Sequence, residues 1–225
     1  APSFHKLIVK KNKIELPVCI LNLGGIANVT LISDYNKDNF TSRDLGPGNC
    51  LIDEWVRNNT KKKFDNNGDI AKRGKINDLI LNQALENFEN KPNQKTLSFD
   101  TKDFSLGFVR GLDLVDGAAT ITEFTARIIG SELTNFLSQD KEKFEKVLIC
   151  GGGRKNLYLI ERIRNMAHKN LIFQNVDELG IKGDYVESQA FAYLAIRSYL
   201  KLPISFPGTT GCKKPTIGGS IIKNF

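Results

Sequence analysis

The sequence predicts an α/β protein in which helices pack on both faces of a mixed β-sheet. Three β-rich runs follow one another near the start, joined by glycine or polar turns, which is typical of an antiparallel meander. Further along, helical patterns alternate with short apolar strands, which is typical of parallel β-α-β units. A sheet that combines both parts is mixed, and helices must cover its faces.

The meander is expected to contain residues 18–23, 28–33 and 40–45, with Gly24 and Gly25 in the first turn. A helix over residues 50–59 follows, because its apolar residues fall on one stripe. Residues 57–110 are more polar and less periodic, so we expect a helical and loop insertion at about 57–115. The whole chain, residues 1–225, is expected to form a single lobe.

The second part begins with a long helical pattern over residues 116–137. The apolar run at 146–150 predicts a strand that leads into three glycines, and 170–176 predicts another strand. Helices are expected over 156–167 and 183–200. Their expected inward residues are Leu157, Ile160, Ile163 and Met166 in the first, and Val186, Ala190, Phe191, Leu194 and Ala195 in the second.

The predicted order is therefore β-β-β-α, an insertion, and then α-β-α-β-α. This order is the layout of a ribonuclease-H-like lobe, the building block of actin-like and sugar-kinase ATPases. Such a lobe places its ligands at the carboxyl ends of its strands, as open α/β sheets do.

Composition narrows the classes of function. The chain has 225 residues, 40% of them hydrophobic and 25% charged, which is typical of a soluble globular protein. No apolar run is long enough for a membrane helix, and the first residues lack the apolar segment of a signal peptide. The net charge of +7 indicates a lysine-rich surface, since aromatic residues do not alternate with the basic ones as nucleic-acid stacking requires. Nucleic-acid binding is the weaker alternative.

Cysteine and histidine usage argues against a zinc site and against a disulfide framework. The four cysteines are widely spaced and form no CxxC pair, and the only two histidines, His5 and His168, are far apart. A reducing, cytoplasmic setting is the expectation. Cys19 and Cys150 lie in apolar strand patterns and are expected to be small core residues.

Three glycine sites are candidates for binding phosphate: Gly24-Gly25, Gly46 with Gly48, and Gly151 to Gly153. Glycine lets several backbone N–H groups approach one anion, and each site follows a predicted strand. Neither standard nucleotide motif is present, because GxxxxGK[ST] does not occur and position 156, where GxGxxG needs glycine, is asparagine. Turn geometry alone is the alternative explanation for each site.

Two carboxylates leave similar alternatives open. Glu187 follows Asp184 by three residues, so the pair could form a capping box for the last helix, or Glu187 could be functional. Asp44 precedes a glycine turn and could orient that loop rather than take part in chemistry.

Seven segments together resemble the anhydro-N-acetylmuramic acid kinase family. They are LNLGGIANVT, DLGPGNCLIDEW, FDNNGDIAKRGK, DGAATITEFTA, CGGGRKN, GDYVESQAFAYLA and PISFPGTTG. The resemblance implies an actin-type sugar kinase that uses ATP and water to open an anhydro sugar and phosphorylate its 6-hydroxyl. The implied product is N-acetylmuramic acid 6-phosphate, in the recycling of cell-wall peptidoglycan.

The resemblance also implies roles for particular residues. Gly24, Gly25 and Asn28 resemble a phosphate-binding hairpin, and Gly151, Gly152, Gly153 and Asn156 resemble a turn that contacts adenosine. Gly46, Gly48 and Asn49 resemble a loop that lines the cleft, and Glu187 resembles a carboxylate on the sugar side. The implied cofactors are ATP and Mg²⁺, with no protein site for a metal. Leu45 departs from the family's usual threonine, and the stretch KTLSFDTKDF lacks the family's arginine.

The family's first phosphate loop, its His-Gly-Gln-Thr stretch and its general-base aspartate have no counterpart in this sequence. The chain is therefore expected to be the C-terminal lobe, with no catalytic residue of its own and little activity alone, because phosphoryl transfer needs groups on both sides of the cleft. The alternatives are a non-catalytic remnant, or a subunit completed by a separately encoded first lobe. The implied partners are the amino sugar and ATP, with a homodimer left open and neither nucleic acid nor membrane expected.

Overall fold

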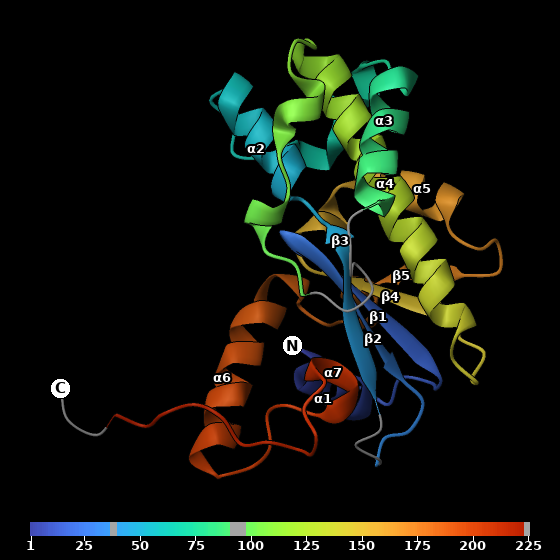
Figure 1. The fold of residues 1–225 in the computed structure, drawn as a ribbon. Coiled ribbons are helices and arrows are strands. Elements are labelled where there is room, and N and C mark those ends of the chain that lie inside the picture. The colour runs from blue at the N-terminus through green and yellow to red at the C-terminus, as the bar shows by residue number, and fades with distance from the viewer. Residues whose placement is uncertain (37–39, 91–97, 223–225) are drawn as a thin grey trace.

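The computed structural model describes residues 1–36, 40–90 and 98–222, and it contains one five-stranded mixed sheet (Figure 1). Its strands are β1 (Val18–Leu23), β2 (Ile26–Ile32), β3 (Thr41–Pro47), β4 (Lys146–Cys150) and β5 (Ile172–Asn175), in the order β3-β2-β1-β4-β5. Strands β1 to β3 pair antiparallel, whereas β4 runs parallel to both β1 and β5. This arrangement confirms the predicted α/β class and the ribonuclease-H-like lobe.

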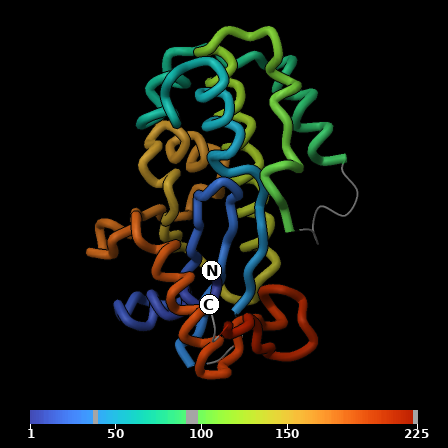
Figure 2. The backbone as a smooth tube through the Cα atoms, turned by 90° about the vertical axis from the view of Figure 1, so that its left-hand side faces the viewer, coloured from blue at the N-terminus to red at the C-terminus, as the bar shows by residue number. Residues whose placement is uncertain are grey.

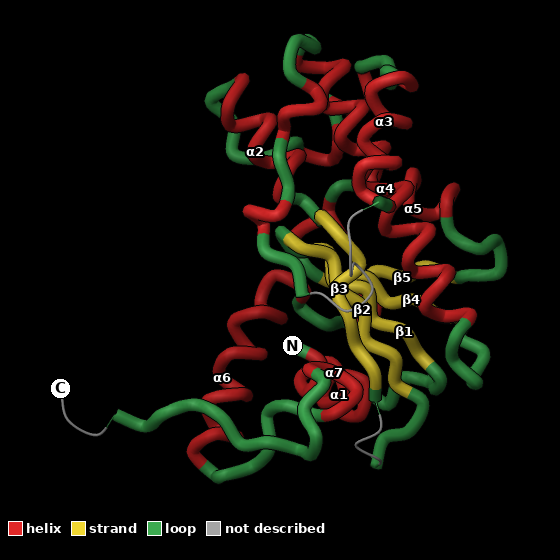
Figure 3. Tube along the Cα trace, in the orientation of Figure 1, coloured by secondary structure: helices red, strands yellow, loops and turns green. Residues whose placement is uncertain are grey.

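Helices cover both faces of the sheet, and two more lie beyond one of its ends (Figure 3). Helices α4 (Leu114–Ser138) and α5 (Leu157–Met166) cover one face, and α1 (Pro2–Lys11), α6 (Val186–Tyr199) and the short α7 (Pro207–Thr210) cover the other. Helices α2 (Cys50–Asn59) and α3 (Asp78–Glu89) lie beyond one end of the sheet, at the top of Figure 1. The molecule is consequently elongated along the strand direction, as the second view shows (Figure 2).

Strand alternation divides the core into two hydrophobic clusters. On β1, Leu21 and Leu23 belong to the cluster beneath α2 to α5, whereas Val18 and Ile20 belong to the cluster beneath α1 and α6. Because successive side chains point to opposite faces, Asn22 belongs to the same face as Ile20. This face is the one on which the candidate site lies.

The predicted insertion contributes to the first of these clusters. Leu81, Phe88 and Val109 are all buried in it, together with residues of the sheet. Asp44 of β3 accepts hydrogen bonds from Ser98 Oγ and from the backbone N–H of Phe99, both at 3.0 Å. Asp44 therefore fastens the end of the insertion to the sheet, whereas the sequence had suggested that it orients the glycine turn that follows it. The position expected for the family's arginine falls partly on residues 91–97, which lie outside the described residues.

The five strands and helices α2, α4, α5 and α6 lie within a few residues of their predicted positions, but several inward positions differ. Helices α1 and α7 were not predicted, and α3 lies in the insertion, for which no helix bounds were predicted. Leu157, Met166 and Phe191 are 60%, 38% and 67% exposed, and Ala195 is exposed too, so the expectation that they face inward was wrong. On α6 the buried residues are Val186 and Ala190, a narrow stripe four residues apart, because only one edge of this helix packs into the second hydrophobic cluster.

Burial confirms the expected core role of two cysteines. Cys19 and Cys150 are 0% and 1% exposed, and burial raises the pKa of both thiols, that of Cys150 to about 12. All four cysteines carry free thiols. None of the helices in the described part of the chain has the length and apolar character needed to cross a bilayer.

Candidate functional site

The candidate site is a cleft at the carboxyl ends of β1 and β4. These strands are parallel neighbours, so the turns that follow them, at Gly24 and at Gly151, lie at the same edge of the sheet. The cleft has a volume of about 500 Å³ and continues along the face covered by α1 and α6. Its lining residues are Ala1, His5, Asn22, Gly24, Gly25, Ile26, Asn28, Gly151, Gly152, Arg154, Gly183, Asp184, Val186, Glu187, Ala190, Phe191 and Leu194.

The turn between β1 and β2 is supported from behind by the start of α2. Gly25 O accepts from the N–H of Gly48, and Gly24 O accepts from the N–H of Asn49, both at 2.8 Å. The Asn49 side chain donates as well, to Leu23 O at 3.1 Å and to Gly24 O at 3.2 Å. Among the described residues, no backbone carbonyl accepts from the N–H of Gly24 or Gly25. The carbonyl groups of the turn are therefore hydrogen-bonded within the protein, whereas the N–H groups of Gly24 and Gly25 are available to a ligand.

The turn after β4 packs directly on the end of β1. Gly151 has φ +81°, and a Cβ there would lie 2.5 Å from Asn22 Oδ1 and 2.6 Å from Leu23 O. A Cβ on Gly153 would lie 2.7 Å from Leu23 Cβ. Both positions therefore need glycine for the two turns to meet, whatever binds in the cleft.

Three other glycines of the cleft have no such structural reason. A Cβ on Gly24 or Gly25 would have its nearest neighbour at 3.4 Å, an ordinary contact, and on Gly152 it would meet nothing within 4 Å. None of the three has the positive φ that favours glycine. Their bare backbone is exposed to the cleft without being required by the fold.

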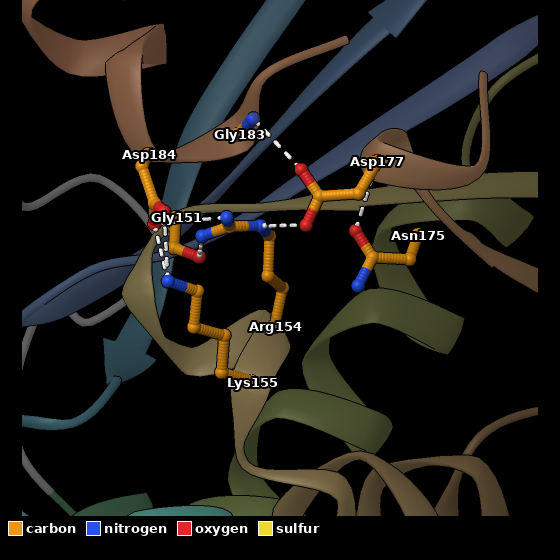
Figure 4. A network of polar contacts seen from close by, with 7 residues as sticks. All are labelled: Gly151, Arg154, Lys155, Asn175, Asp177, Gly183 and Asp184. Carbon is orange, nitrogen blue, oxygen red and sulfur yellow. Dashed lines mark hydrogen bonds and ion pairs between the residues drawn. The ribbon is translucent and has the colours of Figure 1, made fainter. Parts of the chain in front are cut away.

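A buried arginine joins the second turn to the segment before α6 (Figure 4). Arg154 is only 2% exposed; its Nε donates to Asp177 at 2.8 Å, its Nη2 to Asp184 at 2.9 Å and its Nη1 to Gly151 O at 3.1 Å. Asp177 also accepts from the N–H of Gly183 at 2.8 Å. The guanidinium therefore sets where the β4 turn stands relative to the wall of the cleft that carries Glu187.

Charges within this network explain the pKa values of its members. Hydrogen bonds from Lys155 and then Arg154 lower the pKa of the exposed Asp184 carboxyl. Burial alone would raise the pKa of Asp177, but the hydrogen bond and charge of Arg154 outweigh it and the pKa is lowered. Both carboxylates are thus held ionised by their partners.

The capping-box alternative for Asp184 and Glu187 was wrong. The residue that caps α6 is Tyr185, no side chain caps the helix there, and Asp184 binds Arg154 and Lys155 instead. Glu187 lies in the exposed first turn of α6 and lines the cleft. It is the carboxylate of the cleft that the arginine network leaves uncommitted.

The eleven predicted site residues fall into two groups, those that line the cleft and those that lie behind it. Six line the cleft: Gly24, Gly25, Asn28, Gly151, Gly152 and Glu187. The other five lie in the structure around the turns: Gly46, Gly48, Asn49, Gly153 and Asn156. Gly46 packs against Ile128 of α4, and Asn156 caps α5 by accepting from the N–H of Leu159 at 3.0 Å.

Two residues of the cleft were not predicted as candidates. Asn22 of β1 pairs directly across the hairpin with Asn28, and the alternation along β1 was the signal that places it on the cleft face. His5 reaches the cleft from α1, and no sequence signal linked it to the glycine turns. No group of three or more potential metal-ligating side chains occurs within residues 1–36, 40–90 and 98–222.

Comparison with known proteins places the chain in a family. The family profile of anhydro-N-acetylmuramic acid kinase matches residues 1–224. Kinases of that description from Pelagibacter ubique and Zymomonas mobilis are 52% and 38% identical to the chain over 225 and 223 residues. These matches cover 100% and 98% of the chain but only 60% and 58% of the two relatives, so the chain spans less than two thirds of their length.

Among solved structures, component A of (R)-2-hydroxyglutaryl-CoA dehydratase from Acidaminococcus fermentans is 15% identical, with a TM-score of 0.46, over 77% of this chain and 60% of that one. The activator of 2-hydroxyisocaproyl-CoA dehydratase from Clostridium difficile, with bound ADPNP, is 16% identical with a TM-score of 0.41, over 72% and 55%. The family assignment rests on the profile and the sequence relatives alone. The chain belongs to the anhydro-N-acetylmuramic acid kinase family.

Proposed function

We propose that the chain forms the ATP-holding part of a kinase that acts on 1,6-anhydro-N-acetylmuramic acid. The observation that carries the proposal is the meeting of two glycine turns, Gly24-Gly25 and Gly151-Gly152, at one cleft. Three of these four glycines have room for a side chain, so packing does not explain them. Close approach of a ligand to the backbone does.

A nucleotide polyphosphate is the ligand that suits this arrangement. The N–H groups of Gly24 and Gly25 are available at the mouth of the cleft, and successive backbone donors form a favourable site for an anion. Asn22 and Asn28 add side-chain amides beside the same turn. Arg154, although positive, is committed to Asp177 and Asp184, so its role is to position the turn rather than to bind phosphate.

Mg²⁺ fits the site as a companion of the nucleotide. The described residues offer no ready cage of carboxylates, and Mg²⁺ is commonly bound through substrate phosphates and water with one or two carboxylates. Glu187 is the uncommitted carboxylate that could reach such an ion, directly or through water. When bound, the ion would shield the charge of the phosphates.

The other chemical steps of the proposed reaction take place at the sugar. Water adds to C1 of the anhydro sugar, the C1–O6 bond breaks, and O6 takes the γ-phosphoryl group while ADP leaves. The proton lost by water needs a general base. We place that base, as the resemblance implies, in the part of the relatives that this chain does not span. The product, N-acetylmuramic acid 6-phosphate, belongs to peptidoglycan recycling in the cytoplasm.

Binding calorimetry with the non-hydrolysable ATP analogue AMP-PNP and Mg²⁺ tests the proposal. The chain alone is expected to bind the analogue weakly, because kinases of this kind hold the nucleotide with groups on both sides of the cleft and the chain spans less than two thirds of its relatives. Adding the segment that corresponds to the rest of a relative should tighten binding and allow ATP-dependent turnover of the anhydro sugar. A chain that binds no analogue in either form contradicts the proposal. Binding without turnover in the completed protein favours the non-catalytic alternative.

A further inference from the structure

The cleft contains a histidine that does not belong to the two glycine turns. His5 lies on α1, is 1% exposed, and lines the cleft on the wall shared with α6. Burial lowers its pKa to about 3, so its ring is neutral throughout the physiological range. A neutral imidazole has one nitrogen that donates and one that accepts, and the chemistry depends on which is which.

A chain of hydroxyl groups favours one tautomer of this ring. Ser42 Oγ donates to Val29 O at 2.6 Å, and this carbonyl can only accept. Thr30 Oγ1 then donates its single proton to Ser42 Oγ at 3.3 Å. His5 Nδ1 lies 2.8 Å from Thr30 Oγ1, which has only lone pairs left to offer it. All three contacts are satisfied only if Nδ1 carries the ring proton.

The second ring nitrogen, Nε2, is therefore an acceptor. Within the described residues, the buried side-chain polar atoms without a partner are Arg43 Nε, Thr122 Oγ1 and Thr125 Oγ1, and Nε2 of His5 is not one of them. No hydrogen bond among the described residues involves Nε2, and His5 lines the cleft, so the cleft is the side on which this nitrogen is available to a ligand. The fold holds a fixed acceptor at this wall of the cleft.

We infer that His5 is a substrate-positioning residue whose Nε2 accepts a hydrogen bond from a hydroxyl group of the bound sugar. The inference rests on the proposed function. Phosphate oxygens are acceptors, and a lone pair on Nε2 would repel them, whereas a sugar presents hydroxyl donors. His5 also adjoins α6, which carries Glu187, so sugar and polyphosphate would occupy different walls of one cleft.

The tautomer can be measured before any ligand is added. Long-range ¹H–¹⁵N correlation spectra of the chain should show His5 with Nδ1 protonated and Nε2 bare. The chain has only two histidines, and a His168→Gln variant identifies the other set of signals. A protonated Nε2 in the free chain overturns the inference.

Binding supplies the second test, with 1,6-anhydro-N-acetylmuramic acid and AMP-PNP·Mg²⁺ as separate probes on the chain completed by the rest of a relative. The sugar should move the Nε2 resonance toward that of a protonated nitrogen. His5→Ala should weaken sugar binding about 5- to 10-fold, the worth of one neutral hydrogen bond, and leave analogue binding within about twofold. Thr30→Val removes the hydroxyl that fixes the position of the ring proton, so it should weaken sugar binding in part. Thr30→Ser keeps a hydroxyl and should bind the sugar as the wild type does.

The outcomes separate this inference from the proposed function. If the wild-type protein does not bind AMP-PNP, the result counts against the proposed function. If the analogue binds but the sugar response is absent, or is unchanged in His5→Ala, the sugar-positioning role of His5 is wrong. Circular dichroism of each variant establishes that the fold is retained, and His5→Gln, which keeps a polar group near the Nε2 position, should fall between the wild type and His5→Ala.

Discussion

The glycines in and around the cleft fall into two groups, according to whether a Cβ atom would fit there. Gly48, Gly151 and Gly153 would clash with backbone or side-chain atoms at 2.3 to 2.8 Å, so the fold requires them. Gly24, Gly25 and Gly152 would not, so packing within the described residues does not explain them. The sequence predicted all three glycine sites but could not divide them, because the clashing atoms come from residues distant in the chain.

Substitutions at two adjacent glycines should separate these two reasons. Gly152→Ala should leave the melting temperature nearly unchanged and weaken AMP-PNP binding about tenfold, because its methyl group points into open space at the cleft. Gly151→Ala should destabilise the protein by about 1–3 kcal/mol, because φ +81° is strained for alanine and its Cβ meets Leu23 O. Thermal unfolding and calorimetry on both variants provide the measurement. Equal binding by Gly152→Ala and the wild type would show that no ligand approaches there.

His5 should make the protein sensitive to mild acid. Above about pH 6.5 the histidine is neutral in both folded and unfolded chains. Below that pH the unfolded chain takes up a proton that the buried ring, with a pKa of about 3, refuses. The unfolded state is thereby favoured, and the free energy of unfolding should fall by about 2 kcal/mol between pH 6.5 and pH 5.

Urea unfolding of His5→Gln across this range measures that contribution. The variant should show a flatter dependence of stability on pH than the wild type. His168→Gln, at an exposed histidine, is the matched control and should retain the wild-type slope. Parallel slopes for wild type and His5→Gln would mean that His5 is protonated or accessible in the folded protein.

Elements with a strong local pattern of apolar residues could be predicted from the sequence. Elements with a weak pattern, or with only a narrow buried stripe, could not. The hairpin, α2 and α4 carry dense apolar patterns, and the structure has them where the sequence predicted. Helix α1 has only a weak local signal, with Pro2 at its first position and Phe4 and Ile8 four residues apart. The inward face of α6 was not predictable, because apolar residues occur all round this helix and only tertiary contact selects Val186 and Ala190.

The candidate site shows the same limit between elements. Local sequence identified the turns at Gly24 and Gly151, but their meeting depends on β1 and β4 being neighbours. The contact between Arg154 and Asp177 likewise depends on how β5 and the segment after it return to the β4 turn. Long-range pairings of this kind have no local pattern, so the arginine network was found only in the structure.

Breaking the arginine network should loosen the link between the β4 turn and α6. Arg154→Met removes three donors that serve Asp177, Asp184 and Gly151, and we expect a loss of about 1–3 kcal/mol together with weaker AMP-PNP binding. Lys155→Met is the matched control, because Lys155 is 60% exposed and its ion-pair partner among the described residues is the exposed Asp184, so solvent weakens the pair and the loss of stability should be much smaller. Chemical denaturation and calorimetry compare the two variants. Similar losses in both would show that the burial of Arg154 is unimportant.

At the scale of the whole molecule, one sheet serves two hydrophobic clusters. The central strands contribute alternate residues to the two clusters, so the sheet links the packing of one face to that of the other. Both faces of the sheet contribute to the cleft. The start of α2, which lies on the face of the first cluster, supports the turn between β1 and β2. Helices α1 and α6, on the opposite face, form a wall of the cleft. The geometry of the site therefore depends on the sheet as a unit.

Cooperative unfolding of the two clusters is the consequence. Trp55, the only tryptophan, is buried in the cluster of α2 to α5, whereas Ile20 of β1 is 1% exposed in the opposite cluster. Ile20→Ala should cost about 2–5 kcal/mol and lower the melting temperature by roughly 5–15 °C for a domain of this size. The same shift should be seen in Trp55 fluorescence and in far-ultraviolet circular dichroism, since one transition includes both faces. Leu21→Ala, the next residue on β1 and part of the tryptophan's own cluster, is the matched control. If Ile20→Ala leaves the Trp55 transition in place while Leu21→Ala moves it, the two faces unfold separately and the sheet does not couple them.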